Sequence, residues 1–324
     1  MPLRLGVLGT FVWDTIWTLD DQAAGRPFES WGGMSYSVAA AAAARPEGWE
    51  IVPVAKVGAD LVDAARAWAA AIPGVDAERG IVGVPEPNNR VELRYHDHAN
   101  RGEILTGGVA PWTWDELAER VDGLDALCVN YFSGFEIGLE ATERLRVEFA
   151  GPLYADLHSL FLGPPGAEAR TMRRLPEWER WAACFDAVQL NEDELLMLGS
   201  GAGAAPLMAA GPSVVAVTHG PTGATVLRRA GMAPDPLRWP GARGGEVEGR
   251  LHPTAPRAGD PTGCGDVWGA TFFTTLLGGA EWDAAVEAAH WAAARKMEAR
   301  GAADLYPRLS RADFPSTPPR RVVS

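Results

Sequence analysis

Residues 258–266 read Ala-Gly-Asp-Pro-Thr-Gly-Cys-Gly-Asp and lead into an apolar run, Val-Trp-Gly-Ala-Thr-Phe-Phe, that ends at Phe273. Glycines followed by apolar residues predict a turn that opens a buried helix. The first amides of a helix have no partner inside it, so they can bind an anion. Gly263 and Gly265 let the main chain approach a phosphate closely. Asp266, where the turn meets the helix, is placed to accept a proton from an attacking hydroxyl.

A plainer interpretation of this segment stays open. Asp266 also suits the N-cap of an ordinary helix, and short glycine motifs occur in many proteins without a site. The pattern GxxxxGK(S/T) is absent, and the glycine-rich run at 199–203 does not follow a predicted strand. The two commonest nucleotide-binding motifs are therefore disfavoured.

The composition limits the classes of partner. The chain has 324 residues, 47% of them hydrophobic, which is enough to bury a full core. Its formal charge of −13, without a long basic run, argues against nucleic acid as a partner. The cysteines, Cys128, Cys184 and Cys264, lack metal-ligand spacing and favour a reducing compartment. No signal peptide or membrane-spanning stretch is evident, so we expect a soluble, cytoplasmic protein.

Short β-type runs alternate with Ala-rich or amphipathic helical stretches along most of the chain. The predicted strands are residues 3–9, 51–58, 126–131, 153–156, 187–191 and 214–218. The clearest predicted helices are residues 36–44, 61–71, 140–149 and 282–300. This alternation predicts an α/β fold with a doubly wound, mainly parallel sheet flanked by helices. Ligands of such sheets bind at the carboxyl ends of the strands.

Two segments interrupt the alternation. Residues 17–28 are polar and rich in turn formers, whereas 91–96 and 101–105 alternate as half-exposed strands do. We interpret both as parts of a small β-sheet lid, inserted at about residues 15–30 and 86–108. The exposed edge of such a lid predicts a homodimer formed through it.

The remaining boundaries follow from composition. We expect one α/β domain at residues 1–314 and, after it, a loose tail at 315–324 that contains three prolines. Residues 201–212 and 240–250 are rich in glycine, alanine or proline and are predicted to be surface loops.

Several motifs of this chain resemble those of the PfkB, or ribokinase-like, carbohydrate kinases. The segment from Asp260 to Asp266 resembles that family's C-terminal signature. Four more segments resemble family motifs in the same order: Trp31-Gly32-Gly33, Val57-Gly58-Ala59-Asp60, Asn191-Glu192-Asp193-Glu194, and Val217-Thr218-His219-Gly220 with Gly223-Ala224. The resemblance implies a ribokinase-like fold and a kinase that transfers the γ-phosphate of ATP to a hydroxyl of a small sugar, cyclitol or nucleoside.

The resemblance also implies a role for each matching residue. Asp266 would be the catalytic base, and the amides of Gly263, Cys264 and Gly265 would form the anion hole. The implied nucleotide-binding residues are Asn191, Thr218, Gly220, Gly223, Thr262 and His290. The implied substrate-binding residues are Asp14, Gly32, Gly33 and Ser37. Asn191 and Glu194 would hold Mg²⁺ through water, and a monovalent cation is left open as a further cofactor.

Some positions depart from the family pattern. Ser37 stands where Asn is common, and His158 and Leu160 replace an Asn and an Arg. These changes leave the substrate undefined. They also keep two alternatives open, a non-catalytic sensor of sugars or nucleotides on the same fold, and a kinase of vitamin precursors.

Overall fold

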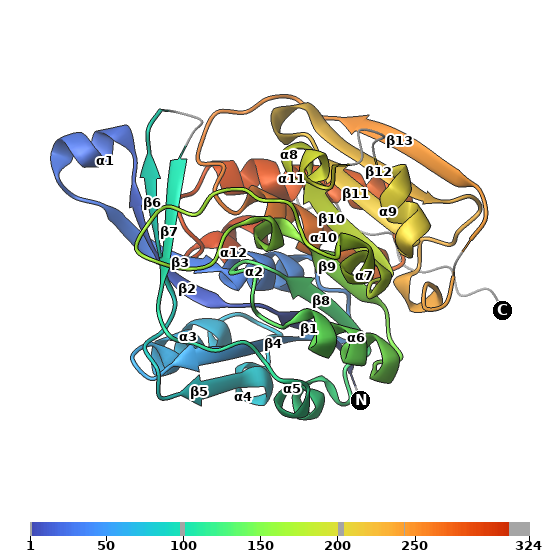
Figure 1. Ribbon diagram of the computed structural model, residues 1–324, viewed down its shortest axis with the longest axis horizontal. Coiled ribbons are helices and arrows are strands. Elements are labelled where there is room, and N and C mark those ends of the chain that lie inside the picture. The colour runs from blue at the N-terminus through green and yellow to red at the C-terminus, as the bar shows by residue number, and fades with distance from the viewer. Residues whose placement is uncertain (1, 98–100, 200–203, 243, 311–324) are drawn as a thin grey trace.

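The computed structural model describes residues 2–97, 101–199, 204–242 and 244–310 (Figure 1). The predicted tail at 315–324 lies outside these residues. A large sheet runs through the molecule with helices on both faces, and a smaller sheet stands at one side of it (Figure 1). The predicted α/β fold class is thus confirmed.

The large sheet has nine strands in the order β13-β12-β11-β10-β9-β8-β1-β4-β5. Their bounds are β1 Leu3–Leu8, β4 Trp49–Gly58, β5 Ile81–Val84, β8 Ala126–Asn130, β9 Leu153–Asp156, β10 Ala187–Asn191, β11 Val214–Thr218, β12 Gly223–Arg229 and β13 Val247–Pro253. The strands from β11 to β5 in this order pair in parallel, and β12 pairs antiparallel with both β11 and β13. All six predicted strands are present.

Helices cover both faces because the central strands are apolar on both sides. One face carries α2 Met34–Ala44, α3 Val62–Ala70, α10 Cys264–Leu277, α11 Trp282–Met297 and α12 Leu305–Leu309. The other carries α5 Trp114–Val121, α6 Leu139–Glu148, α7 Trp178–Ala183 and α9 Ala205–Ala210. Shorter elements are α4 Ala77–Gly80, α8 Glu192–Met197, and the 3-10 turns His158–Phe161, Gly220–Thr222 and Pro236–Arg238. The central helix α10 packs between α2 and α11 and is buried along most of its length.

The smaller sheet forms a lid, which we define as β2 Phe11–Trp17, β3 Phe28–Gly33, β6 Arg90–Tyr95, β7 Arg101–Thr106 and α1 Leu19–Ala24. Its strand order is β3-β2-β6-β7. Along β6, Val91, Leu93 and Tyr95 are buried while Arg90 and Arg94 are exposed, which is the alternation that the sequence predicts. The apolar face packs in a small core of its own. The homodimer through the lid stays a prediction.

Three local predictions need correction. Residues 17–28 contain α1, which a capping box of Thr18 and Asp21 begins and Gly25 ends. Part of the predicted loop 201–212 is α9, and part of the predicted loop 240–250 belongs to β13. Strand β13 was overlooked because it is exposed and polar, so it lacks an apolar run. Among the described residues, no helix combines the length and the apolar character needed to cross a bilayer.

Candidate active site

Asp266 lies in the first turn of α10, at the carboxyl ends of the central strands, and is only 8% exposed. Asn130, the last residue of β8, holds it in place. The Asn130 side-chain amide donates to Oδ1 of Asp266 at 2.5 Å and to Oγ of Ser37 at 2.9 Å. Burial raises the pKa of Asp266, and the positive charge of His158 and the Asn130 hydrogen bond oppose that rise. The carboxylate is therefore fixed in direction and more basic than an exposed one.

The anion turn, which we define as residues 260–265, precedes this carboxylate. The amide of Thr262 donates to Oδ1 of Asp260 at 3.0 Å, and the amide of Cys264 donates to the carbonyl of Pro261 at 3.1 Å. Within the described chain, the amides of Gly263 and Gly265 make no hydrogen bond. Gly265 is exposed and Gly263 half-buried, so these two amides are accessible to a ligand.

Gly263 has a positive φ of 81°, and a Cβ built on it would lie 2.6 Å from ring atoms of Tyr36. We therefore expect Gly263→Ala to destabilise the fold by about 1–3 kcal/mol. Gly220→Ala is the matched control, since Gly220 has a φ of 52° and open space around it. Urea denaturation of both variants checks the expectation. Equal losses in the two would mean that the Tyr36 contact does not matter.

Asp14 lies on β2 of the lid, and its side chain is fully buried. Within the described part of the chain, neither of its carboxylate oxygens has a hydrogen-bond partner. Burial raises the pKa of Asp14 well above its ordinary value; Arg101 opposes this, and the carboxylates of Glu103, Asp266 and Asp260 add to it. A buried carboxylate without donors is costly, so an unpaired pair of oxygens here points to a ligand that supplies hydroxyl donors.

Gly32, on the neighbouring strand β3 of the lid, makes room for that carboxylate. A Cβ on Gly32 would lie 1.9 Å from Oδ2 of Asp14. Gly33 begins α2 with a φ of 60°, and Ser37 lies on that helix with its hydroxyl against Asn130. The structure thus brings Asp14, Gly32, Ser37 and Asp266 into one region, although the first and last are 252 positions apart in the sequence.

Arg101 connects the lid to the anion turn. Its Nη1 donates to Oγ1 of Thr262 at 2.6 Å and to the hydroxyl of Tyr95 at 3.1 Å. The other two arginines of the lid strands stay on the surface, where Arg90 pairs with Asp60 and Arg94 with Glu92. Thr262 thus accepts a hydrogen bond from the lid, and its contact with a nucleotide stays a prediction.

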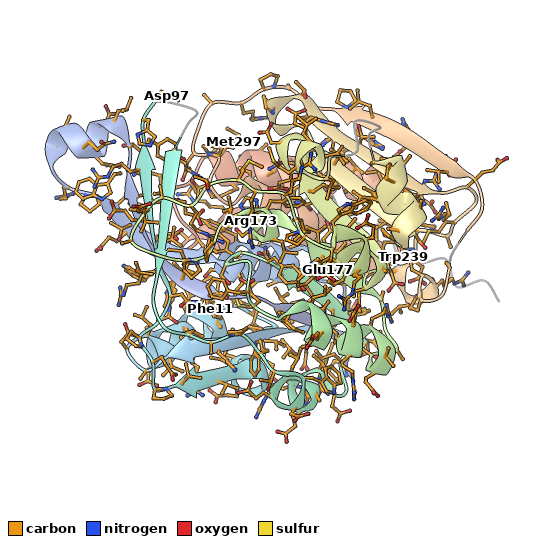
Figure 2. The ribbon with its side chains drawn as sticks, viewed as in Figure 1. Phe11, Asp97, Arg173, Glu177, Trp239 and Met297 are labelled. Carbon is orange, nitrogen blue, oxygen red and sulfur yellow. The ribbon has the colours of Figure 1, made fainter. Side chains whose placement is uncertain are left out.

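A cavity of about 440 Å³ lies between the lid and the body. Asp97, at the tip of the lid, and Met297, at the end of α11, are two of its lining residues (Figure 2). Asp260 and Pro261 of the anion turn also line it. The cavity therefore reaches the first residues of the anion turn.

The predicted metal ligands form a tight pair at the start of α8. Oε1 of Glu194 accepts from Nδ2 of Asn191 at 2.8 Å and from Nδ1 of His158 at 2.6 Å, and Oε2 accepts from the amide of Asn191 at 2.8 Å. Burial lowers the pKa of His158, but Glu194 and Asp156 outweigh it and raise that pKa to about 10. Glu194 is buried and nearly saturated with donors, so the pair fits a hydrated Mg²⁺ held through water and not a directly bound ion.

The predicted nucleotide residues lie at the ends of β11 and β12 and on α11. Thr218 ends β11, and Gly220 and Gly223 form the turn into β12. His290 lines a separate pocket of about 380 Å³, with Pro253, Thr254 and Trp291 among its other walls. Within the described residues, Nε2 of His290 is buried without a partner. The described walls of this pocket come from β13, the residues after it as far as Arg257, and α11.

Sequence reasoning missed three polar residues of the site. Asn130 holds Asp266; Gln189 donates to Oδ2 of Asp156 at 3.1 Å and to the carbonyl of Gly265 at 3.0 Å. The signal was available, because Asp156 ends a predicted parallel strand and Asn130 and Gln189 lie near the ends of two others.

Comparisons with known proteins agree with this geometry. The model of the pfkB family carbohydrate kinases matches residues 169–309. No curated protein sequence matches the chain.

Solved structures show the same fold over almost the whole chain. A pyrophosphate-dependent kinase of the ribokinase family, complexed with a pyrophosphate analogue and myo-inositol, has a TM-score of 0.67 at 17% identity, covering 92% of this chain and 96% of that one. The nucleoside kinase of Burkholderia thailandensis in complex with inosine has 0.67 at 17%, covering 94% and 96%. Arabidopsis thaliana ribokinase with ribose and ATP has 0.65 at 18%, covering 95% and 97%.

The family match includes the anion turn and Asp266, and the shared fold extends well beyond it to the lid. The chain thus matches the pfkB family carbohydrate kinases over residues 169–309, and over almost its whole length it has the fold of the ribokinase-family structures.

Proposed function

We propose that this protein transfers the γ-phosphate of ATP to a hydroxyl of a small sugar, cyclitol or nucleoside. One observation carries the proposal. Asp266, which Asn130 holds, directly follows the anion turn, whose Gly263 and Gly265 amides have no hydrogen-bond partner in the described chain. The carboxylate of Asp14, which no described residue donates to, lies close enough to interact with the charge of Asp266. Phosphoryl transfer needs mainly alignment and charge stabilisation, and this arrangement supplies both.

Each group then has a defined task. Asp14 accepts hydrogen bonds from two hydroxyls of the acceptor and so orients it. Asp266 takes the proton of the attacking hydroxyl while the new O–P bond forms and the bond to the leaving ADP breaks. The amides of Gly263 and Gly265 donate to the oxygens of the transferring group. Mg²⁺, when held through water beside Asn191 and Glu194, would neutralise charge on the phosphates.

The pocket beside His290 favours a nucleotide over pyrophosphate as the donor. Its volume of about 380 Å³ suits a base with its ribose, and a pyrophosphate donor has no use for it. Burial lowers the pKa of His290, so its ring is neutral and its unpaired Nε2 is available to hydrogen bond with a base.

A substrate panel tests the proposal. The purified protein with Mg²⁺ and ATP is offered sugars, cyclitols and nucleosides, and ADP release is measured for each. Phosphorus NMR of the product then identifies the esterified hydroxyl. Pyrophosphate in place of ATP tests the donor, and hydroxymethylpyrimidine and pyridoxal test the vitamin-precursor alternative. Failure to form ADP or phosphate with any acceptor contradicts the kinase.

One observation favours the sensor alternative. Nδ1 of His158 forms an ion pair with Oε1 of Glu194, the carboxylate that would otherwise attract a metal cation. Calorimetry distinguishes the two functions, because a sensor binds a small molecule tightly and forms no ADP from ATP.

The contact between lid and turn predicts an effect on substrate binding. Arg101→Met removes a charged donor to Thr262 and Tyr95, so we expect the KM of the acceptor to rise about tenfold or more. Arg94→Met is the matched control, because Arg94 lies on the adjacent strand and, among the described residues, pairs with Glu92 and the Trp17 ring. Steady-state kinetics of both variants decide. An unchanged KM in Arg101→Met would contradict a closing role for this contact.

A further inference from the structure

Lys296, near the end of α11, is completely buried. Lysine is almost never found so deep unless its charge is satisfied. Here Nζ donates to the carbonyl of Ala299 at 2.9 Å, to the carbonyl of Asp260 at 3.2 Å and to Oδ2 of Asp260 at 3.4 Å. Three oxygen acceptors match the three donors of an ammonium group. The mechanism proposed above does not use this residue.

The oxygen cage around Lys296 includes the first residue of the anion turn. Asp260 accepts from Lys296 through its carbonyl and Oδ2, and through Oδ1 it accepts from the amide of Thr262. Nζ also lies 5.5 Å from the centre of the Tyr36 ring, and that ring packs against Gly263. One buried positive charge therefore joins α11, α2 and two points of the anion turn, Asp260 and Gly263.

A cage of this kind is what a monovalent cation selects. Backbone carbonyls, with a carboxylate and an aromatic face, replace the hydration shell of a small cation of single charge. The same three oxygen atoms already accept hydrogen bonds from Lys296. A free monovalent ion therefore does not fit at this position, because the tethered ammonium supplies its charge.

We propose that Lys296 is a positioning residue whose ammonium acts as a built-in monovalent cation and holds the anion turn in its binding conformation. The kinetic part of this inference rests on the proposed kinase function. If Lys296 supplies this charge, turnover should not depend on added potassium, sodium or ammonium ions. The conformation of the anion turn should depend on a charge at this one point.

The first test uses the unmodified protein. Initial rates are measured at about 100 mM chloride of potassium, sodium, ammonium or tetramethylammonium, at equal ionic strength. Equal rates are expected, because the cage is filled from within the chain. Strong activation by one of the small cations would overturn the proposal, and this test needs no variant to fold.

The second test removes the charge and returns it from solution. Lys296→Met keeps most of the side-chain volume but takes away the Lys296 donor from Oδ2 of Asp260 and from the carbonyls of Asp260 and Ala299. In tetramethylammonium chloride we expect kcat to fall about 100-fold, since a small displacement of an aligned group costs that much. Potassium or ammonium ions are expected to restore much of it. A folded variant whose activity no monovalent cation raises would contradict the inference.

The chain offers a matched control in its only other lysine, Lys56. Lys56 is also buried, and it donates to Oε2 of Glu116 at 2.7 Å and to the carbonyl of Pro111 at 3.1 Å, on the opposite face of the sheet from α11. Lys56→Met removes a buried ammonium of equal size without touching the anion turn. We expect it to lower stability and to show no dependence on monovalent cations.

A readout without turnover separates this inference from the kinase proposal. The melting temperature of Lys296→Met is expected to rise when potassium chloride replaces tetramethylammonium chloride, and that of Lys56→Met and of the unmodified protein to stay level. If no acceptor is ever phosphorylated but this shift is seen, the kinase proposal fails and the role of Lys296 stands. If turnover is found but the shift and the rescue are absent, the role of Lys296 fails alone.

Discussion

Replacing Asp266 by Asn is expected to lower kcat by about 10²–10⁴-fold, which is the range that a positioned general base contributes. The amide has nearly the same shape, and its oxygen still accepts the hydrogen bond from Asn130 that Oδ1 accepts now. It cannot take up the proton of the attacking hydroxyl. Because the amides of the anion turn are untouched, the affinity for ADP, measured by calorimetry, should stay close to that of the unmodified protein.

Asp193→Asn is the control for this experiment. Asp193 lies at the start of α8, near the same end of the sheet, but is exposed. It should leave kcat unchanged. Full turnover in Asp266→Asn would remove Asp266 from the mechanism, and loss of ADP binding together with kcat would indicate a structural role instead.

For Asp14, opposite changes in activity and stability are expected. Asp14→Asn should lower kcat/KM for the acceptor by about 10²–10⁴-fold, because two hydrogen bonds to a charged acceptor are weakened. The same change should raise the melting temperature of the free protein. The carboxylate is fully buried and no described residue donates to it, so the neutral amide is less costly to bury.

The raised pKa of Asp14 also predicts how the stability gained by Asp14→Asn changes with pH. Burial raises the pKa of Asp14 in the folded protein, so between the ordinary carboxyl range and that raised pKa the folded state binds more protons than the unfolded one. The Asp14 contribution to the free energy of unfolding therefore falls as the pH rises through this window. Asp14→Asn lacks this loss, so its advantage in stability should grow with pH.

Urea denaturation at about pH 5 and pH 8 measures that difference. Glu29→Gln is the control, since Glu29 lies on the neighbouring strand β3 with its side chain exposed. It should not change the pH dependence. An Asp14→Asn protein that is less stable than the unmodified one at both pH values would show that partners of Asp14 inside the protein had been overlooked.

Local patterns were enough to predict a large part of the fold. The six predicted strands are all present because each is a continuous apolar run between turn formers. The turn at residues 258–266 was found in the same way, since glycines before an apolar helix act on neighbouring residues only. Where the local pattern is weak, prediction failed: β13 is polar and exposed, and α1 is a single short helix inside a polar segment.

Contacts between residues far apart in the sequence could not be predicted. Asp14 meets the charge of Asp266, Arg101 reaches Thr262, and His158 reaches Glu194 across 36 positions. No spacing rule links such pairs, because they come together only when β2, β7, β9 and α10 have taken their places around the sheet. The burial of Lys296 against Asp260 is of the same kind.

The amino-acid sequence by itself determined the α/β class, the positions of the main strands along the chain, and the turn that carries Asp266, because hydrogen bonding and burial along a few neighbouring residues specify these features. Only the tertiary structure decided which amides of that turn have no hydrogen-bond partner, which carboxylates are buried, and that the ammonium group of Lys296 contacts the turn. Those properties depend on desolvation and charge, and both are set by residues that packing brings in from elsewhere in the chain.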